Sequence, residues 1–371
     1  MGIVIFGAGR YGRQLRRILE HEGEEVLFFA DNNIPSGTYI DGICVIKPCD
    51  IPDKAPAADV YLSSPTIIDA VMEQLNEMAL RNPVFMVPEY VYAYRWSDRC
   101  PIAIRMDVAK PRLPYLECKI VFHCNLNCNG CSAIANIHEK EFLSEEDFER
   151  DLKKLKELYS GIRYLKLFGG EPLLHSHLEG MIELARSYFP DSELVVHSNG
   201  ILVPQVKESL LDKMRESNVG FVFTLYPPTG VRKRQIENRL NRADVPYEFT
   251  QPVYEFRKYI DPSGKMDAGE VFRKCAKCVN LYRGTLSCGL GHGIDLLERR
   301  YETSICDCKW EHCVNIHETK LNGREINLLL DSPCELCRYC SYMDYGAVAE
   351  ENYYPWACGE AKLEDWLLDR A

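Results

Sequence analysis

His123-Cys124-Asn-Leu-Asn-Cys128-Asn-Gly-Cys131 is the stretch that decides the fold of this 371-residue chain. It follows a predicted strand over residues 117–123 and places three thiols at spacings of three and two residues. Thiolates this close together suit one metal centre better than several disulfides. Three thiolates can hold three corners of a [4Fe–4S] cluster and leave one iron open. A structural zinc site is usually closed by a fourth ligand, for which His123 and His138 are nearby, so the loop alone leaves both centres open.

Predicted strands and helices alternate after this loop, and the strands end in polar or glycine-rich turns. Gly169-Gly-Glu-Pro172 follows the strand over residues 164–168, and Ser198-Asn-Gly200 follows the strand over residues 193–197. Tyr226-Pro-Pro228 follows a later strand. Repeated βα units of this kind predict a partial or full barrel whose chemistry lies at the C-terminal ends of the strands.

The order of these motifs, over about residues 115–260, resembles that of the radical S-adenosylmethionine (SAM) superfamily. The resemblance implies a partial (β/α)6 TIM-like barrel and a [4Fe–4S] cluster on Cys124, Cys128 and Cys131, with SAM on the open iron. It implies that the Gly-Gly-Glu-Pro turn receives the SAM amino group and that the Ser-Asn-Gly turn contacts the ribose and carboxylate. The family places an aromatic residue before the third cysteine, against the adenine, but Gly130 stands there, so Tyr226 is our candidate. The candidate SAM-binding residues are Gly169, Gly170, Glu171, Pro172, Ser198, Asn199 and Tyr226.

The reaction that the resemblance implies is reductive cleavage of SAM to methionine and a 5′-deoxyadenosyl radical, which removes a hydrogen atom from an unactivated carbon. The cofactor carries this chemistry, and the protein supplies orientation and excludes side reactions. A one-electron reductant such as a flavodoxin or a ferredoxin is the expected protein partner.

The C-terminal third of the chain is rich in cysteine. It resembles the shortened auxiliary-cluster extension of many radical SAM enzymes, in which a strand pair with a glycine turn carries the first ligands of a second [4Fe–4S] cluster. The candidate auxiliary ligands are Cys275, Cys278, Cys288, Cys337 and Cys340. A structural zinc site is the alternative. One of the remaining thiols could donate a hydrogen atom, as thiols do in radical epimerases; the candidates are Cys306, Cys308, Cys313 and Cys358.

A second glycine motif lies at the N-terminus. Gly7, Gly9 and Gly12 separate a predicted strand from a helix, and Asp31 follows at the position expected for an acidic residue that binds a ribose. The motif predicts a nucleotide with its phosphate at the helix N-terminus. The stretch also resembles a small Rossmann-like domain often attached to sugar-modifying proteins, where the fold can serve as an interaction module without a nucleotide.

Composition sets limits on the class of protein. A net charge of −11 argues against nucleic acid as a main partner, and we find no apolar run of membrane-spanning length and no signal-peptide pattern. Seventeen cysteines in such a chain indicate metal ligands in the cytoplasm more than a disulfide framework. We therefore expect an α/β protein with a Rossmann-like domain, a barrel core and a Cys-rich α+β extension. The expected ranges are 1–100, 112–262 and 263–371, with a linker over residues 96–114.

The first hypothesis for function is hydrogen abstraction from a carbohydrate, for epimerisation or oxidation of a carbinol carbon. It rests on the sugar-related resemblance of the N-terminal region. The alternatives are radical modification of a ribosomal peptide and a zinc- or nucleotide-binding scaffold without catalysis.

Overall fold

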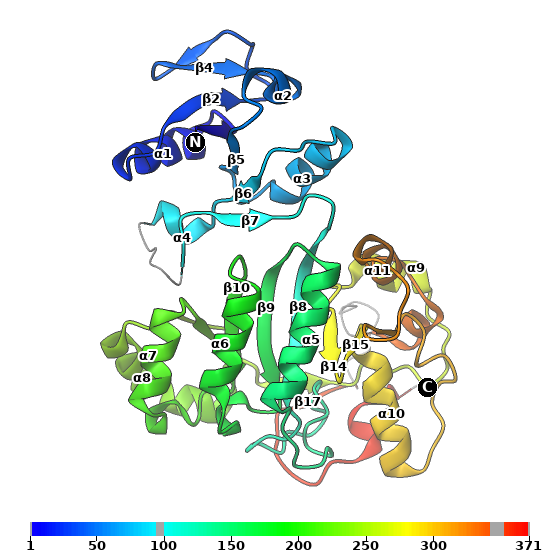
Figure 1. The fold of residues 1–371 in the computed structure, drawn as a ribbon. Helices are drawn as coiled ribbons and strands as arrows, with labels where there is room; N and C mark the ends of the chain where they lie inside the picture. Colours follow the sequence, from blue (N-terminus) through cyan, green and yellow to red (C-terminus); the bar gives the residue numbers. More distant parts are fainter. Residues whose placement is uncertain (1, 94–99, 342–351, 370–371) are drawn as a thin grey trace. The chain divides into compact units, whose positions relative to one another are not determined.

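Strand β1 (Ile3–Phe6) runs through the first sheet of the computed structural model (Figure 1), because its side chains are apolar on both faces. Val4 and Phe6 pack into one buried cluster, and Ile3 and Ile5 pack into another. Burial on both faces is typical of a parallel strand covered by helices on each side. The structure describes residues 2–93, 100–341 and 352–369.

The first sheet has the strand order β3-β4-β2-β1-β5-β6-β7 and belongs to a unit made of Met1–Arg112, Lys156–Gly161 and Phe189–Asp191. The pairs that involve β1 are parallel, as a doubly wound fold requires, and β7 is antiparallel to β6. The other strands are β2 (Val26–Ala30), β3 (Tyr39–Ile40), β4 (Ile43–Ile46), β5 (Asp59–Leu62), β6 (Val84–Met86) and β7 (Ile104–Met106). The helices are α1 (Arg10–His21), η1 (Pro48–Asp50), α2 (Ile51–Lys54), α3 (Ile68–Glu77) and α4 (Glu89–Tyr92).

The predicted linker over residues 96–114 differs from the structure. Its first residues, 96–99, lie outside the described residues, and β7 then adds an antiparallel strand to the first sheet. Strand β8 (Arg112–Val121) begins before the predicted linker ends. The three prolines in this stretch conceal β7 and the first residues of β8 in the sequence, because proline usually marks a break.

The second unit comprises Leu113–Leu155, Ile162–Tyr188 and Ser192–Ala371 and carries a sheet of order β12-β11-β10-β9-β8-β14-β15-β16. The pairs β9–β10, β10–β11, β11–β12 and β8–β14 are parallel. The strands are β9 (Gly161–Gly169), β10 (Glu193–Ser198), β11 (Gly220–Phe223), β12 (Tyr247–Phe249), β14 (Asn280–Tyr282), β15 (Thr285–Ser287) and β16 (Val314–Asn315), and the separate pair β13 (Glu255–Arg257) and β17 (Tyr353–Pro355) is antiparallel. This mixed α/β sheet is the partial barrel that the sequence predicts.

Helices connect the strands of this sheet (Figure 1). They are α5 (Glu145–Leu158), η2 (Pro172–Leu174), α6 (Leu178–Tyr188), η3 (Val203–Gln205), α7 (Glu208–Glu216) and α8 (Pro227–Ala243). The sequence does not predict helix α8, because Tyr226-Pro-Pro228 is typical of a turn at a strand end. In the structure both prolines are the first residues of the helix, where proline is tolerated. After the barrel come α9 (Ala268–Lys274), α10 (Leu290–Tyr301), α11 (Gly323–Leu330), η4 (Glu335–Tyr339) and η6 (Leu363–Asp365).

The Cys-rich region is continuous with the barrel sheet. Its hairpin β14–β15 pairs with β8 through Asn280 and Leu281, so the described residues after 263 add strands to the barrel sheet. The hairpin turn is Arg283-Gly284, both with positive φ, which matches the glycine turn expected there. A buried apolar cluster that includes Ile260, Ile294 and Trp366 joins the end of the barrel to α10 and the C-terminal residues. No helix in the described part of the chain is long and apolar enough to span a membrane.

Candidate active site

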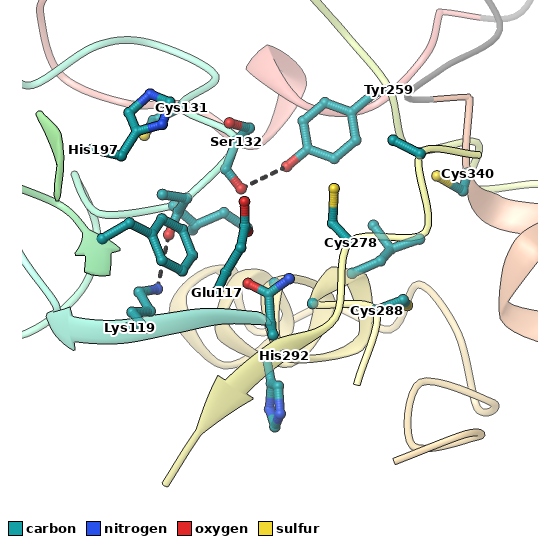
Figure 2. A pocket seen from close by; sticks show the side chains of 18 of the residues that line it. Glu117, Lys119, Cys131, Ser132, His197, Tyr259, Cys278, Cys288, His292 and Cys340 are labelled. Atoms are coloured by element: carbon teal, nitrogen blue, oxygen red, sulfur yellow. Dashed lines mark hydrogen bonds between the residues drawn. The ribbon is translucent and has the colours of Figure 1, made fainter. Parts of the chain in front are cut away.

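A cavity of about 970 Å³ lies in the second unit (Figure 2). Its wall contains side chains of β8, β9 and β10, the cysteine loop, and the region after residue 252. Two sets of thiols line it: Cys124, Cys128 and Cys131 from the loop, and Cys275, Cys278, Cys288, Cys334, Cys337 and Cys340 from the Cys-rich region. The structure therefore brings both predicted groups of cysteine ligands to one cavity.

Two of the loop thiols, Cys124 and Cys128, lie in surroundings that favour their neutral form. Burial raises the pKa of Cys124 to about 12 and raises that of Cys128 as well. The Leu126 amide and the Asn199 side chain donate to Cys124 Sγ at 3.4 and 3.5 Å. A buried thiolate needs a positive centre and hydrogen-bond donors, so three such sulfurs fit the iron ions of a cluster that leaves one iron open.

Neither nearby histidine completes a zinc site with this loop. His123 and His138 are absent from the cavity wall. His138 stacks on Phe122, contacts Tyr282 Oη at 3.3 Å, and has its pKa lowered to about 4 by burial. Among the described residues, no three His, Cys, Asp or Glu side chains form a group that could hold a single metal ion such as zinc.

Glu171 takes a different position from the predicted one. Its carboxylate is fully buried and accepts from Leu173 N at 3.0 Å, Ser198 Oγ at 2.7 Å and Asn199 N at 2.8 Å. Neither Glu171 nor Pro172 lines the cavity, whereas Gly169 and Gly170 do. Glu171 therefore joins the two turns that follow β9 and β10. A contact of its carboxylate with SAM stays a prediction.

The two glycines of the same turn allow β9 to approach the cysteine loop. A Cβ on Gly169 would lie 2.0 Å from Val121 O, and one on Gly170 would lie 1.8 Å from His123 O. Backbone hydrogen bonds at this contact run from Gly170 N to Val121 O and from Glu171 N to His123 O. Only glycine fits so close to another backbone.

Ser198 and Asn199 line the cavity. The Asn199 side-chain amide donates to two acceptors in the cysteine loop, Cys124 Sγ and, at 2.7 Å, Asn125 Oδ1. These bonds fix the turn after β10 against the loop. Tyr226 also lines the cavity, and its ring stacks on Trp356 with centroids 5.9 Å apart.

The missing aromatic residue at Gly130 has a physical cause. Gly130 adopts a φ of +61°, and a Cβ there would lie 1.7 Å from Tyr354 Oη. A C-terminal tyrosine therefore occupies the space where a side chain at position 130 would begin.

The Cys-rich region presents its thiols on both sides of the β14–β15 hairpin. Cys278 precedes the hairpin and Cys288 follows it, while Cys337 and Cys340 come from η4 and its end. Cys334, which was not among the favoured ligands, lies 3.9 Å from Cys337 sulfur to sulfur and lowers the pKa of that thiol to about 6. Its place in the Cys-x2-Cys-x2-Cys run was the signal that could have included it.

The proposed hydrogen-atom donors lie elsewhere. None of Cys306, Cys308, Cys313 and Cys358 is part of the cavity wall. Cys306 and Cys308 contact each other at 2.7 Å, and Cys358 forms an isolated backbone bridge with Cys128. A hydrogen-donor role for any of these four thiols stays a prediction.

Polar side chains of the strands, which the sequence argument missed, form the rest of the wall. Lys166 pairs with Glu117 at 2.6 Å, and Glu117 also accepts from Tyr115 Oη at 2.6 Å. Lys119 donates to Ala133 O at 2.9 Å, and burial lowers its pKa to about 8 (Figure 2). His197, next along the sheet, contacts Thr224 Oγ1 at 2.7 Å. Alternating polar residues in the otherwise apolar strand Glu-Cys-Lys-Ile were the available signal.

The N-terminal glycine motif lies in the first unit and serves the fold there. A Cβ on Gly12 would lie 1.9 Å from Gly7 O, so Gly12 lets α1 approach β1. The Asp31 carboxylate accepts from Ala8 N at 2.9 Å and from two amides of its own loop; although burial opposes them, these bonds lower its pKa. Gly9 precedes α1, with open space around the place of a Cβ. A nucleotide at this motif stays a prediction.

Comparison with known proteins places one segment of the chain. The family model of the radical SAM superfamily matches residues 119–263. Relatives include a GTP 3′,8-cyclase of Sulfurovum sp. (29% identical over 101 residues, 26% of this chain and 30% of that one) and one of Aliarcobacter butzleri (28% over 104 residues, 27% and 32%). The chain spans about a third of the length of these curated relatives.

Solved structures show a partial likeness. BtrN in complex with AdoMet and 2-DOIA has 17% identity and a TM-score of 0.39, covering 66% of this chain and 99% of that one. Native anSMEcpe with bound AdoMet has 19% identity and a TM-score of 0.32, covering 38% and 44%. Likeness at this level says nothing about the substrate. The family match, over the residues that carry the cysteine loop and both turns beside it, shows that the chain contains a domain of the radical SAM superfamily.

Proposed function

We propose that the chain is a cytoplasmic radical SAM enzyme that removes a hydrogen atom from a carbinol carbon of a carbohydrate. Cys124, Cys128 and Cys131 would hold the cluster, and the turns ending in Gly170 and Asn199 would hold SAM. With an electron from a flavodoxin or ferredoxin, that pair of cofactors supplies a carbon radical able to abstract hydrogen.

The polar wall of β8, β9 and β10 carries the proposal. Glu117, Lys119, Lys166 and His197 offer a carboxylate, two ammonium groups and an imidazole within one cavity. A polyol presents hydroxyls that both donate and accept, so it needs such mixed partners more than an apolar pocket. The imidazole is neutral, because burial and then the charge of Lys166 lower the pKa of His197 to about 3. A neutral imidazole has a nitrogen that can accept a hydrogen bond from a substrate hydroxyl.

The position of the thiols favours oxidation over epimerisation. Epimerisation needs a hydrogen-atom donor that reaches the substrate, and none of the four candidate thiols lines the cavity. Oxidation needs an acceptor for the second electron. A [4Fe–4S] cluster held by four of the Cys275, Cys278, Cys288, Cys334, Cys337 and Cys340 thiols would supply that acceptor in the same cavity.

The experiment is anaerobic incubation of the iron-loaded protein with SAM, reductant and a panel of sugars, sugar phosphates, nucleotide sugars and peptides in deuterated water. Oxidation is expected to give a sugar that has lost two hydrogens, with no solvent deuterium on carbon, whereas epimerisation would give an inverted carbon bearing one deuterium.

Glu117→Gln and Lys166→Met should raise KM for the sugar with little change in SAM cleavage. A peptide product with every sugar unchanged would overturn the proposal.

A further inference from the structure

The C-terminal residues 352–369, called here the C-terminal strap, are built into the cysteine loop. The backbone of Cys358 bridges that of Cys128 in antiparallel fashion, Asn129 N donates to Ala357 O at 3.0 Å, and Gly359 N donates to Asn127 O at 3.0 Å. Residues 353–355 of the strap form β17, which pairs with β13. The strap therefore lies between β13 and the loop that carries the three thiols.

Side chains of the strap strengthen this contact. Trp366 is fully buried, and its Nε1 donates to Cys131 O at 2.9 Å. Tyr354 Oη donates to Asp365 O at 2.8 Å and fills the space above Gly130. These contacts fix the backbone of the loop against the strap, so the strap side chains hold defined positions beside the three thiols.

The indole N–H of Trp356 is a buried hydrogen-bond donor. Among the described residues its Nε1 atom finds no hydrogen-bond partner of normal geometry, although the atom is shielded from water. Its ring is held by Tyr226, which stacks on it, and its backbone N donates to Tyr254 O at 2.7 Å. A buried N–H without an acceptor is rare in folded proteins and indicates a missing partner.

The group that this indole faces is the Cys128 thiol. The indole N–H is directed at the Cys128 sulfur, and the strap backbone two residues further on, at Cys358, bridges the backbone of Cys128. A neutral thiol is a weak acceptor, whereas a thiolate bound to iron carries negative charge and accepts strongly. The donor is therefore positioned for the ligated form of Cys128.

We propose that Trp356 is a positioning residue for the cluster, donating its indole N–H to Cys128 Sγ and raising the reduction potential of the cluster. Reduction adds negative charge to the cluster and its sulfurs, and a hydrogen-bond donor at a sulfur stabilises that charge. The inference rests on the radical SAM domain and is independent of the proposed substrate.

The test is a redox titration of the iron-loaded full-length protein, followed by electron paramagnetic resonance of the reduced cluster. Trp356→Phe keeps an aromatic ring against Tyr226 and removes only the donor. In Trp356→Phe, at a fixed applied potential, we expect the ratio of reduced to oxidised cluster to be about tenfold lower than in the wild type. This change corresponds to a fall of about 59 mV in the reduction potential of a one-electron couple. Trp310→Phe is the control, because Trp310 is exposed on another segment and its loss should leave the potential unchanged.

A second measurement covers the case in which Trp356→Phe loses iron. Wild-type protein carrying ¹⁵N-labelled tryptophan should show a nuclear coupling of one indole N–H to the reduced loop cluster by electron–nuclear double resonance. An unchanged potential in an iron-replete Trp356→Phe protein, or no such coupling in the wild type, would overturn the proposal. So would equal shifts in the Trp356 and Trp310 variants.

Discussion

Glu171 shows that sequence can place a residue next to a site without giving the direction of its side chain. The motif Gly169-Gly-Glu-Pro172 stands at a strand end, where ligand contacts are expected. The structure turns the carboxylate away from the cavity and engages both of its oxygens with the turn after β10. Sequence reveals the position of such a residue along the chain, but not the direction of its side chain.

Glu171→Gln tests this role. The substitution keeps the size of the side chain but replaces an accepting oxygen with an NH₂ group that faces a donor. We expect the free energy of unfolding to fall by about 1–3 kcal/mol, because a buried donor is left without a partner. Urea denaturation of the metal-free protein measures it. Unchanged stability together with selective loss of SAM binding would instead support direct contact between Glu171 and the ligand.

His197 predicts a pH dependence of stability. Burial, with a further contribution from Lys166, lowers its pKa from 6.5 to about 3 in the folded protein. Between these values the unfolded chain binds a proton that the folded protein does not, so stability falls as the pH drops from about 6.5 towards 3. The contribution is at most about 1.4 kcal/mol per pH unit, or about 2 kcal/mol between pH 6.5 and 5.

His197→Gln keeps a hydrogen-bonding group beside Thr224 and removes the titration. Urea unfolding of the metal-free protein between pH 6.5 and 4 should therefore show a shallower loss of stability in the variant than in the wild type. Parallel curves for the two proteins would mean that His197 is protonated in the folded state, in conflict with its burial.

At the scale of elements, the barrel depends on close contact between strand ends. Gly170 lies against the carbonyl of His123, the residue before the first thiol of the loop. The end of β9 thus supports the loop that follows β8, and the turn after β10 is tied to the same place through Asn199. The site is assembled by backbone contacts between neighbouring strands, in addition to its side chains.

Gly170→Ala should disturb that support. The new Cβ would meet His123 O at 1.8 Å, so the loop or β9 must shift. We expect a loss of about 1–3 kcal/mol in stability, typical of overpacking, and lower iron content per chain. Gly230→Ala is a matched control, because nothing lies within 4 Å of a Cβ at that helical position. Equal iron content in both variants would show that the contact does not position the loop.

At the scale of the whole molecule, the sequence predicted the barrel and its cysteine loop because their signals are local. A strand followed by Cys124-x3-Cys128-x2-Cys131 can be read within a dozen residues. The continuity of the Cys-rich region with the barrel could not be read in that way. It depends on pairing between Glu117 and Asn280, which are far apart in sequence.

The C-terminal strap escaped the sequence argument for the same reason. Nothing near Trp356 or Tyr354 indicates that these side chains lie against residues 127–130. Gly130 was the one visible trace of the contact, as a departure from the family pattern. A glycine at a position where the family has an aromatic residue can therefore indicate that a segment distant in sequence occupies the space of that side chain.

The central claim is that the cysteine loop holds an open cluster that cleaves SAM. It is tested most directly by quantifying 5′-deoxyadenosine after anaerobic incubation of the iron-loaded chain with SAM and dithionite. Wild-type protein is predicted to bind about four irons in the loop and to form 5′-deoxyadenosine, whereas Cys124→Ser, Cys128→Ser and Cys131→Ser should each abolish the product. Zinc in place of iron, or equal product from the wild type and the three variants, would contradict the account.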